Sequence, residues 1–489
     1  MKQVHRLMNR SLQRGQALLW FLATTATCCA VLALVYNVGQ VTNEKEKTIN
    51  AADASALSGA LVEARILNFE AYTNRAMIAN EVTIAQFASM DSFIRYAQTL
   101  SQNIATYTSW VPYLNDVTQT IADGVQAAQD VFDPVAYGTI TGVNGVIEAL
   151  KVAREAANLV GAVAANEVAG QVAGANKTVF NGRFDTAPEV NGTVNAAFLV
   201  VNEVTWMNFT SSYDGNDRGN AAQVILNSRD QFTKARGLGL VLDAINIAME
   251  LNTLGLSGIE KTSGSTTLVD YDHWAAQDSL DSWVLTPQFC LGVIPCGFTR
   301  TYLPVPLGYG RTDVDSDGSV GRDLCNPSGG APNCTLAVNN ANVIQPPGWQ
   351  GIPNIRDLAN PGGANNADPS LTYVSAVQKS ADATLTTQRI GGGMNNVHIN
   401  GPQGSPDLTD NLQNSDRLTS IAAARVFYAR PDWNTRDITE GNLPRPDRKH
   451  EYASLYNPYW QARLTPPDPA MTTLLYAAIG KPGLNLVMP

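Results

Sequence analysis

Charged residues and histidines are scarce in this sequence. Charged residues make up 16% of the 489 residues, against about a quarter in typical soluble domains. Ala, Asn, Thr, Ser and Gly take their place, a bias common in exported bacterial surface proteins. The four histidines form no HExxH pair, and the chain has no GxSxG elbow and no Walker phosphate loop. We therefore expect a protein that is not an enzyme and that has no small-molecule substrate.

Positive charge is also in short supply outside the first residues. The 33 Lys and Arg residues against 43 Asp and Glu residues give a formal net charge of -10, which disfavours nucleic acid as a partner. The exception is the segment 1–14, which contains four basic residues and no acid. These four residues are Lys2, Arg6, Arg10 and Arg14.

Cysteines are few and fall in three places. The six are Cys28, Cys29, Cys290, Cys296, Cys325 and Cys334. The last four allow three connectivities, and the short spacings favour the disulfides Cys290–Cys296 and Cys325–Cys334. Zinc is the competing interpretation, although Cys-x5-Cys and Cys-x8-Cys in loops rich in Pro, Gly and Asn are not the usual zinc spacings. Disulfides would place this region outside the cytoplasm.

An apolar segment begins directly after the basic residues. Gln16–Gly39 has 24 residues, and a helix of that length rises about 36 Å, enough to cross a hydrocarbon core of about 30 Å with some tilt. A secretory signal has a shorter apolar core of about 7–15 residues. The balanced charges of Glu44–Lys47 follow the segment, so the basic N-terminus is expected in the cytoplasm. The sequence predicts a retained single-pass anchor.

The helical pattern continues beyond the apolar segment. From Thr42 to Ser109 there is no proline and only one glycine, and apolar residues recur at spacings of three, four and seven. Small residues form two adjacent ridges on this helix. The first ridge is Ala52, Ala56, Ala60 and Ala64, and the second is Ala51, Ser55 and Gly59. Such ridges allow the close approach of another helix, from a neighbouring subunit or from the same chain, and both interpretations remain open.

Two N-terminal motifs carry a family resemblance. The Arg-Gly-Gln-Ala motif at 14–17, the apolar span and the Asn-Ala-Ala-Asp-Ala-Ser-Ala-Leu-Ser-Gly-Ala motif at 50–60 resemble the N-terminal module of TadE/TadG-like proteins of Flp (tight adherence) pilus assembly. The segments 424–431 and 454–464 are similar to the closing segments of long members. The resemblance implies a pilin-like or minor-pilin-like component, anchored in the bacterial inner membrane with a periplasmic body, whose N-terminal helix contacts other pilus or secretion subunits.

One departure from the family pattern concerns processing. Processed pilin-like members have a Gly cleavage point followed five residues later by Glu. Counting from Gly15, that position is Trp20, and the nearest following acid is Glu44, beyond the membrane. A buried carboxylate without a partner is costly in a membrane, so Trp20 suits a helix that stays uncleaved. The integrin-type metal site of some TadG-like proteins is absent from the sequence.

An Asp-rich segment is the one motif with chemical content. In Asp-Val-Asp-Ser-Asp-Gly-Ser, which begins at residue 313, carboxylates alternate before a glycine, as in the first half of a calcium loop. The candidate Ca2+ ligands are Asp313, Asp315, Asp317, Ser319 and Asp323. Leu324 stands where the usual closing acid falls, so the alternative is an exposed acidic turn. For His273, a structural role is favoured over a catalytic one.

The pattern along the chain predicts an α+β fold. We expect a cytoplasmic segment 1–14, a transmembrane helix 15–41 that continues into a long amphipathic helix, a mainly helical region 42–257, a loop-rich β region 258–415 with the cysteine pairs, and a C-terminal family-like segment 416–489. Within these regions we expect extended or mixed structure around 185–214, strands at 282–285 and 299–303, and helices at 416–427 and 471–479. Burial in the core is the favoured role of Tyr456, Tyr459 and Trp460.

The functional prediction follows from the anchor and the resemblance. We expect a non-enzymatic, membrane-anchored component of Flp-type pilus assembly or of a related secretion system. The first alternative is a calcium-stabilised surface adhesin that uses a TadE/G-like anchor. The second is a membrane-tethered enzyme of unrecognised type.

Overall fold

One helix forms the spine of the molecule. The computed structural model describes residues 14–176, 179–180, 192–211, 218–290, 294–325, 331–357, 369–380, 417–430 and 453–469. Helix α2 (Arg14–Thr108) contains 95 residues without a break, a length of about 140 Å. The lack of proline and the abundance of Ala explain its continuity, because Gly59 is its only glycine between Thr42 and Thr108.

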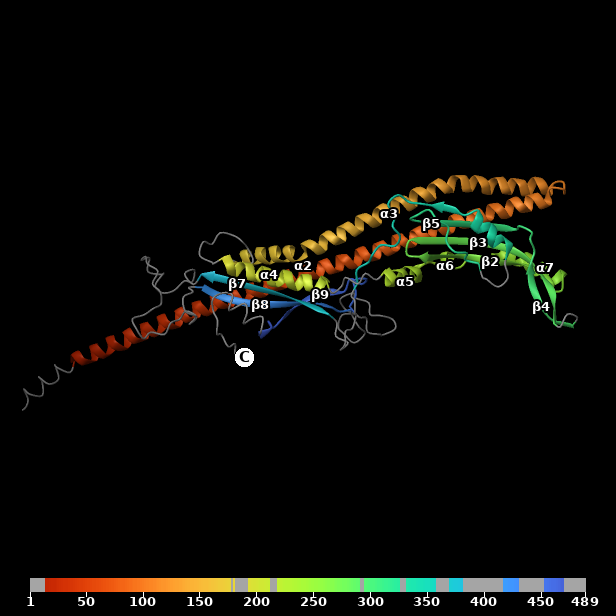
Figure 1. Ribbon diagram of the computed structural model, residues 1–489. Coiled ribbons are helices and arrows are strands. Elements are labelled where there is room, and N and C mark those ends of the chain that lie inside the picture. The colour runs from red at the N-terminus through yellow and green to blue at the C-terminus, as the bar shows by residue number, and fades with distance from the viewer. Residues whose placement is uncertain are drawn as a thin grey trace, which may run out of the picture.

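A second long helix turns back along the first. Helix α3 (Leu114–Ala175) has 62 residues and includes Pro134, and it runs beside α2 as the return arm of a hairpin (Figure 1). The turn falls at 109–113, where Val-Pro-Tyr ends the helical pattern. The hairpin covers one side of two β-sheets that follow one another along α2 (Figure 1).

The sheet nearer the N-terminal end is antiparallel, with strand order β1-β7-β8-β9. Its strands are β1 (Val179–Phe180), β7 (Ser370–Ser380), β8 (Arg417–Tyr428) and β9 (Trp460–Thr465). The core beneath this sheet joins small residues of α2 and α3 to Tyr373, Val426 and Trp460. Segments that lie far apart in the sequence therefore meet on the middle third of the spine.

The second sheet lies at the other end of the hairpin. Its order is β2-β3-β5-β6, with β4 paired to β3, and only β5 and β6 are parallel among these pairs. The strands are β2 (Ser257–Asp270), β3 (His273–Cys290), β4 (Ile294–Tyr302), β5 (Gly308–Asp315) and β6 (Asn342–Ile344). β5 lies so close to α2 that a side chain at Gly310 would overlap the backbone of Ser92 and Tyr96.

Shorter helices complete the described part of the chain. They are α4 (Gly192–Ser211), α5 (Arg218–Ser228), α6 (Gln231–Lys234), α7 (Leu240–Asn252) and α8 (Pro332–Asn339). The architecture is α+β, as predicted, with a long N-terminal apolar helix and a β region that contains a disulfide. The strands expected at 282–285 and 299–303 lie in β3 and β4, apart from Leu303.

Two local expectations are wrong. The segment 185–214, expected to be extended or mixed, contains the 20-residue helix α4, whose Trp206 packs over Gly161 of α3. In the segment 416–427, expected to be a helix, the described residues 417–427 lie in the strand β8 between β7 and β9. In both cases tertiary contacts outweigh a weak local pattern. The helix expected at 471–479 lies outside the described residues.

Candidate functional site

The first part of α2 exposes a continuous apolar surface. Large hydrophobic residues from Leu18 to Val38 are exposed all around the helix, and this is the one helix in the described part of the chain that is long and apolar enough to cross a membrane. The hydroxyl groups of Thr25 and Thr27 donate hydrogen bonds of 2.8 Å to carbonyls one turn earlier. Their polar groups are therefore satisfied within the helix, as a membrane segment requires.

The motif residues Gly15 and Trp20 both lie in this apolar part of α2. Gly15 has helical backbone, and the side chain of Trp20 is 74% exposed. The first acidic residue after them, Glu44, pairs with Lys47 at 3.0 Å, where exposed apolar residues give way to buried small ones. The apolar surface of the preceding helix carries no carboxylate that could pair with a neighbour.

The small-residue ridges lie inside the protein. Ala52, Ala56, Ala60 and Ala64 are buried together with alanines of α3 and residues of β7 and β8. Ser55 donates a hydrogen bond to the Ala169 carbonyl of α3 at 2.9 Å, and the ring of Tyr373 occupies the space beside Gly59. Close approach of a helix is what small residues permit, and here the second helix belongs to the same chain. The small-residue ridges therefore pack against a helix of the same chain, which is the second of the two interpretations.

Buried carboxylates continue along α2 beyond the ridges. Glu81 accepts a hydrogen bond of 3.4 Å from the indole N–H of Trp274 in β3, and its second oxygen is buried without a partner in the described structure. Burial is the main influence on this group and raises the pKa of Glu81 to about 8. Glu81 is therefore largely protonated at neutral pH.

The Asp-rich segment is divided between a strand and a turn. Asp313 and Asp315 end β5 and are buried, whereas Asp317, Ser319 and Asp323 are exposed in the following turn. Gly318 has φ 75°, a conformation that glycine adopts without strain. Asp315 accepts backbone hydrogen bonds from Asp317 and Ser319 at 3.1 and 2.6 Å, which stabilise the turn.

Asp313 is the centre of a charged network. Arg311 donates two hydrogen bonds to it, at 2.6 and 2.9 Å, and His273 Nε2 lies 2.7 Å from its Oδ1 while His273 Nδ1 lies 3.2 Å from Asp315. Burial would raise the pKa of Asp313, but the hydrogen bonds from His273 and Arg311 outweigh it and lower the pKa. Burial would lower the pKa of His273, but Asp313 and Asp315 outweigh it and raise the pKa. These contacts hold His273 of β3 against the end of β5, and its structural role stays a prediction.

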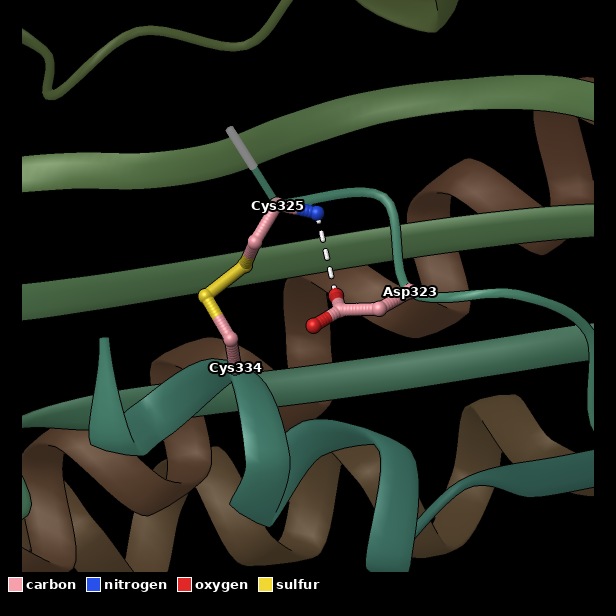
Figure 2. A group of neighbouring side chains, drawn as sticks. All are labelled: Asp323, Cys325 and Cys334. Atoms are coloured by element: carbon pink, nitrogen blue, oxygen red, sulfur yellow. Dashed lines mark hydrogen bonds between the residues drawn. A yellow bond between two sulfur atoms is a disulfide. The ribbon is translucent and has the colours of Figure 1, made fainter. Parts of the chain in front are cut away.

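A disulfide closes the loop behind this network. Cys325 and Cys334 are bonded, and the amide N–H of Cys325 donates to Asp323 at 3.0 Å (Figure 2). Cys296 is also disulfide-bonded, and the side chain of Cys290 lies outside the described residues. Asp323, Cys325 and Cys334 bring three potential metal ligands within 4.8 Å of one another. Two of them are sulfurs bonded to each other, so the group is explained by the disulfide.

Two further members of the network, Arg311 and Gln277, were not predicted from the sequence. The amide of Gln277 in β3 accepts from Arg311 at 2.5 Å and donates to Asp323 at 2.6 Å, linking the strand to the loop. The available signal was the alternation of Arg311, Asp313 and Asp315, which places their side chains on one face of a strand. The calcium loop stays a prediction. Two of its five candidate ligands already have partners within the protein, because Asp313 pairs with Arg311 and His273 and Asp315 lies 3.2 Å from His273.

The comparison with known families identifies the beginning of α2. The sequence model of the Tad family, described as Flp pilus-assembly TadE/G-like, matches residues 15–62. The match contains the apolar part of the helix, Trp20 and most of the small-residue ridges. No curated protein and no solved structure matches the chain. Residues 15–62 of this chain are therefore similar to a TadE/G-like Flp pilus-assembly domain.

Proposed function

We propose that this chain is a non-enzymatic, single-pass component of the Flp pilus-assembly machinery, of the minor-pilin or TadG-like kind. The observation that carries the proposal is the match of residues 15–62 to the Tad family, on a helix whose apolar start is exposed and whose continuation is buried in a folded body. This arrangement suits a protein that holds a large domain at a fixed distance from the membrane.

The orientation belongs to the same proposal. Four basic residues precede the apolar segment, whereas two acids and two bases follow it at 44–47. This asymmetry favours a cytoplasmic N-terminus and a periplasmic body. Cys325–Cys334 supports the placement of the body in an oxidising compartment. Because the small-residue ridges are buried within the chain, contacts with other subunits in the membrane fall to the apolar surface from Leu18 to Val38.

Gene replacement in the bacterium that carries this protein tests the role. Deletion is expected to abolish or shorten Flp pili seen by electron microscopy, and the full chain is expected to restore them. A variant whose segment 1–41 is replaced by a cleavable secretory signal should export the body without restoring pili. A second variant with an unrelated apolar helix in place of 17–39 separates a specific anchor from a plain tether. Unchanged pili after deletion would overturn the proposal.

The same deletion distinguishes a pilus-assembly role from an adhesin role. An adhesin would be needed for attachment to a surface while pilus number and length stay normal. Calcium binding by Asp313, Asp315, Asp317, Ser319 and Asp323 is a separate proposal, supported by the alternating carboxylates and by the exposure of Asp317 and Asp323.

A further inference from the structure

The end of the molecule farthest from the apolar segment exposes large hydrophobic side chains. Trp110 and Tyr113 in the turn between α2 and α3 are 82% and 87% exposed, and Leu254 in the turn between α7 and β2 is 91% exposed. Both turns lie at the same end of the molecule (Figure 1). Exposed apolar groups gathered in one region mark an interaction surface in soluble parts of proteins.

The backbone of both turns supports this interpretation. Tyr113 and Leu254, with φ 68° and 53°, are the two non-glycine residues with positive φ in the described structure. This conformation is strained for large side chains, and neither of the two gains burial within the chain in return. Strain of this kind is found at functional sites.

An apolar groove lies at the hairpin end of α2 and α3. It has a volume of about 340 Å³ and is formed by α2, α3 and the start of α7. Leu100 and Ile104 come from α2, Ile121 and Val125 from α3, and Leu242 from α7. None of the groove-lining side chains is charged, so the groove suits an apolar face.

The unpaired charges on the helices that form the groove are mainly acidic. The helical segments 96–130 and 237–256, which supply most of the groove lining, contain five acids and no basic residue. The acids are Asp116, Asp123, Asp130, Asp243 and Glu250. Two cations lie next to the lining. Arg95 is paired with Asp91 and Asp133, and Lys261, whose Nζ lies 3.9 Å from the centroid of the Tyr96 ring, has a buried side chain and is paired with Asp278 at 2.9 Å. Neither cation therefore offsets the five acids. The surface is therefore apolar in the centre and acidic at its margin.

We propose that this end of the protein is a docking site for an amphipathic helical segment of another protein, with an apolar face and basic flanks. The groove between three helices accepts the apolar face, as in other helix-in-groove complexes, and the acidic margin selects Lys and Arg over Asp and Glu. An anionic lipid surface is repelled by the same charges. The inference rests on this surface alone and does not depend on the pilus role.

Peptide binding to the full chain tests the proposal. The chain is held in phosphatidylcholine nanodiscs, because detergent would fill the groove, and empty nanodiscs give the background. The probes are two fluorescent helical peptides of about 16 residues with the same leucine face, one with Lys and one with Glu on the other face. We expect the Lys peptide to bind at least about tenfold more tightly than the Glu peptide.

Matched variants locate the binding. Ile121→Asn removes a half-exposed groove side chain, and Leu159→Asn removes an exposed leucine of α3 outside the groove. We expect the first to weaken binding of the Lys peptide about tenfold and the second to leave it unchanged. Asp116→Asn with Asp123→Asn should weaken binding and reduce its salt dependence.

Three results would overturn the proposal. Equal binding of the two peptides would remove the charge argument, and equal effects of Ile121→Asn and Leu159→Asn would remove the groove. Binding of the chain to added phosphatidylcholine vesicles that is lost in Trp110→Ser would assign the surface to lipid instead.

Discussion

The ring of Tyr373 in β7 lies against Gly59 of α2, so closely that a methyl group at Gly59 would overlap it. The ring is fully buried, and its hydroxyl donates to Asn166 of α3 at 2.8 Å. One glycine in the Tad-matched segment thus admits the side chain that joins the helical hairpin to the first sheet.

Replacing this glycine tests the contact. Although Ala favours a helix over Gly by about 1 kcal/mol, we expect Gly59→Ala to lower the free energy of unfolding by about 1–3 kcal/mol, because the ring must move. The measurement is the thermal midpoint of the full chain. Gly124→Ala in α3 is the control, because its added methyl group meets open space, and it should be neutral or stabilising. Equal effects at both positions would contradict the packing described here.

The disulfide Cys325–Cys334 is expected to stabilise the far sheet. It closes a loop with a sequence separation of 9 residues, for which loop closure corresponds to about 2–3 kcal/mol. We expect Cys325→Ala with Cys334→Ala to lower the thermal midpoint. Cys28→Ala with Cys29→Ala, which removes the two free cysteines, should not. If the two double variants melt alike, the loop is ordered without its disulfide.

Stability should fall as the pH rises because of Glu81. Its folded pKa of about 8 lies above the unfolded value of 4.5, so between these values the unfolded state loses a proton that the folded state keeps. The loss of folding stability that Glu81 causes is absent below pH 4.5 and complete above pH 8. We expect Glu81→Gln to flatten the decline of the melting temperature across this range, and Glu167→Gln, exposed on α3, to leave it unchanged. A parallel decline in the Glu81→Gln variant would contradict the assignment.

The N-terminus should remain intact. Trp20 stands where processed relatives carry Glu, so we expect the chain purified from its native membrane to retain residues 1–15. Intact-mass measurement decides the matter, with removal of the initiator methionine as the only allowed loss. A mature chain that begins at Gln16 would show that processing does not require the acid.

Calcium is expected to raise the melting temperature through the loop 313–323. A calcium concentration a hundredfold above the dissociation constant would add about 3 kcal/mol. We expect Asp317→Asn with Asp323→Asn to abolish the effect and magnesium not to reproduce it. If calcium leaves the thermal midpoint unchanged, the loop does not bind calcium. The role of Asp313 and Asp315 would then be to pair with Arg311 and His273.

The sequence was most informative where a periodic pattern is long. The absence of proline and the 3.6-residue repeat are enough to predict α2 and the burial of one of its faces. The cysteine spacing predicted Cys325–Cys334, because a sequence separation of 9 keeps these two cysteines closer to each other than to the other pair. Burial of Trp460, which stacks edge-on against Tyr428 at 5.6 Å, followed from its chemistry.

The sequence was least informative where partners are distant. Residues 417–428 carry alanines that suit a helix or a buried strand. Pairing with β7, whose partner residues lie 37 to 57 positions earlier in the chain, favours the strand. For the ridge of Ala52 and Ala56, the small side chains predict close approach but not whose backbone approaches. Long-range pairing supplied α3 and Tyr373 as the answer.

The unbroken helix α2 has a mechanical consequence. About 70 of its residues lie beyond the apolar segment, a rod of about 105 Å that both sheets and α3 stiffen along its length. A change of about 10° in the tilt of the apolar segment would swing the far turn through an arc of about 20 Å. A rigid α2 would therefore convert a small rearrangement of its apolar segment into a large displacement at Trp110.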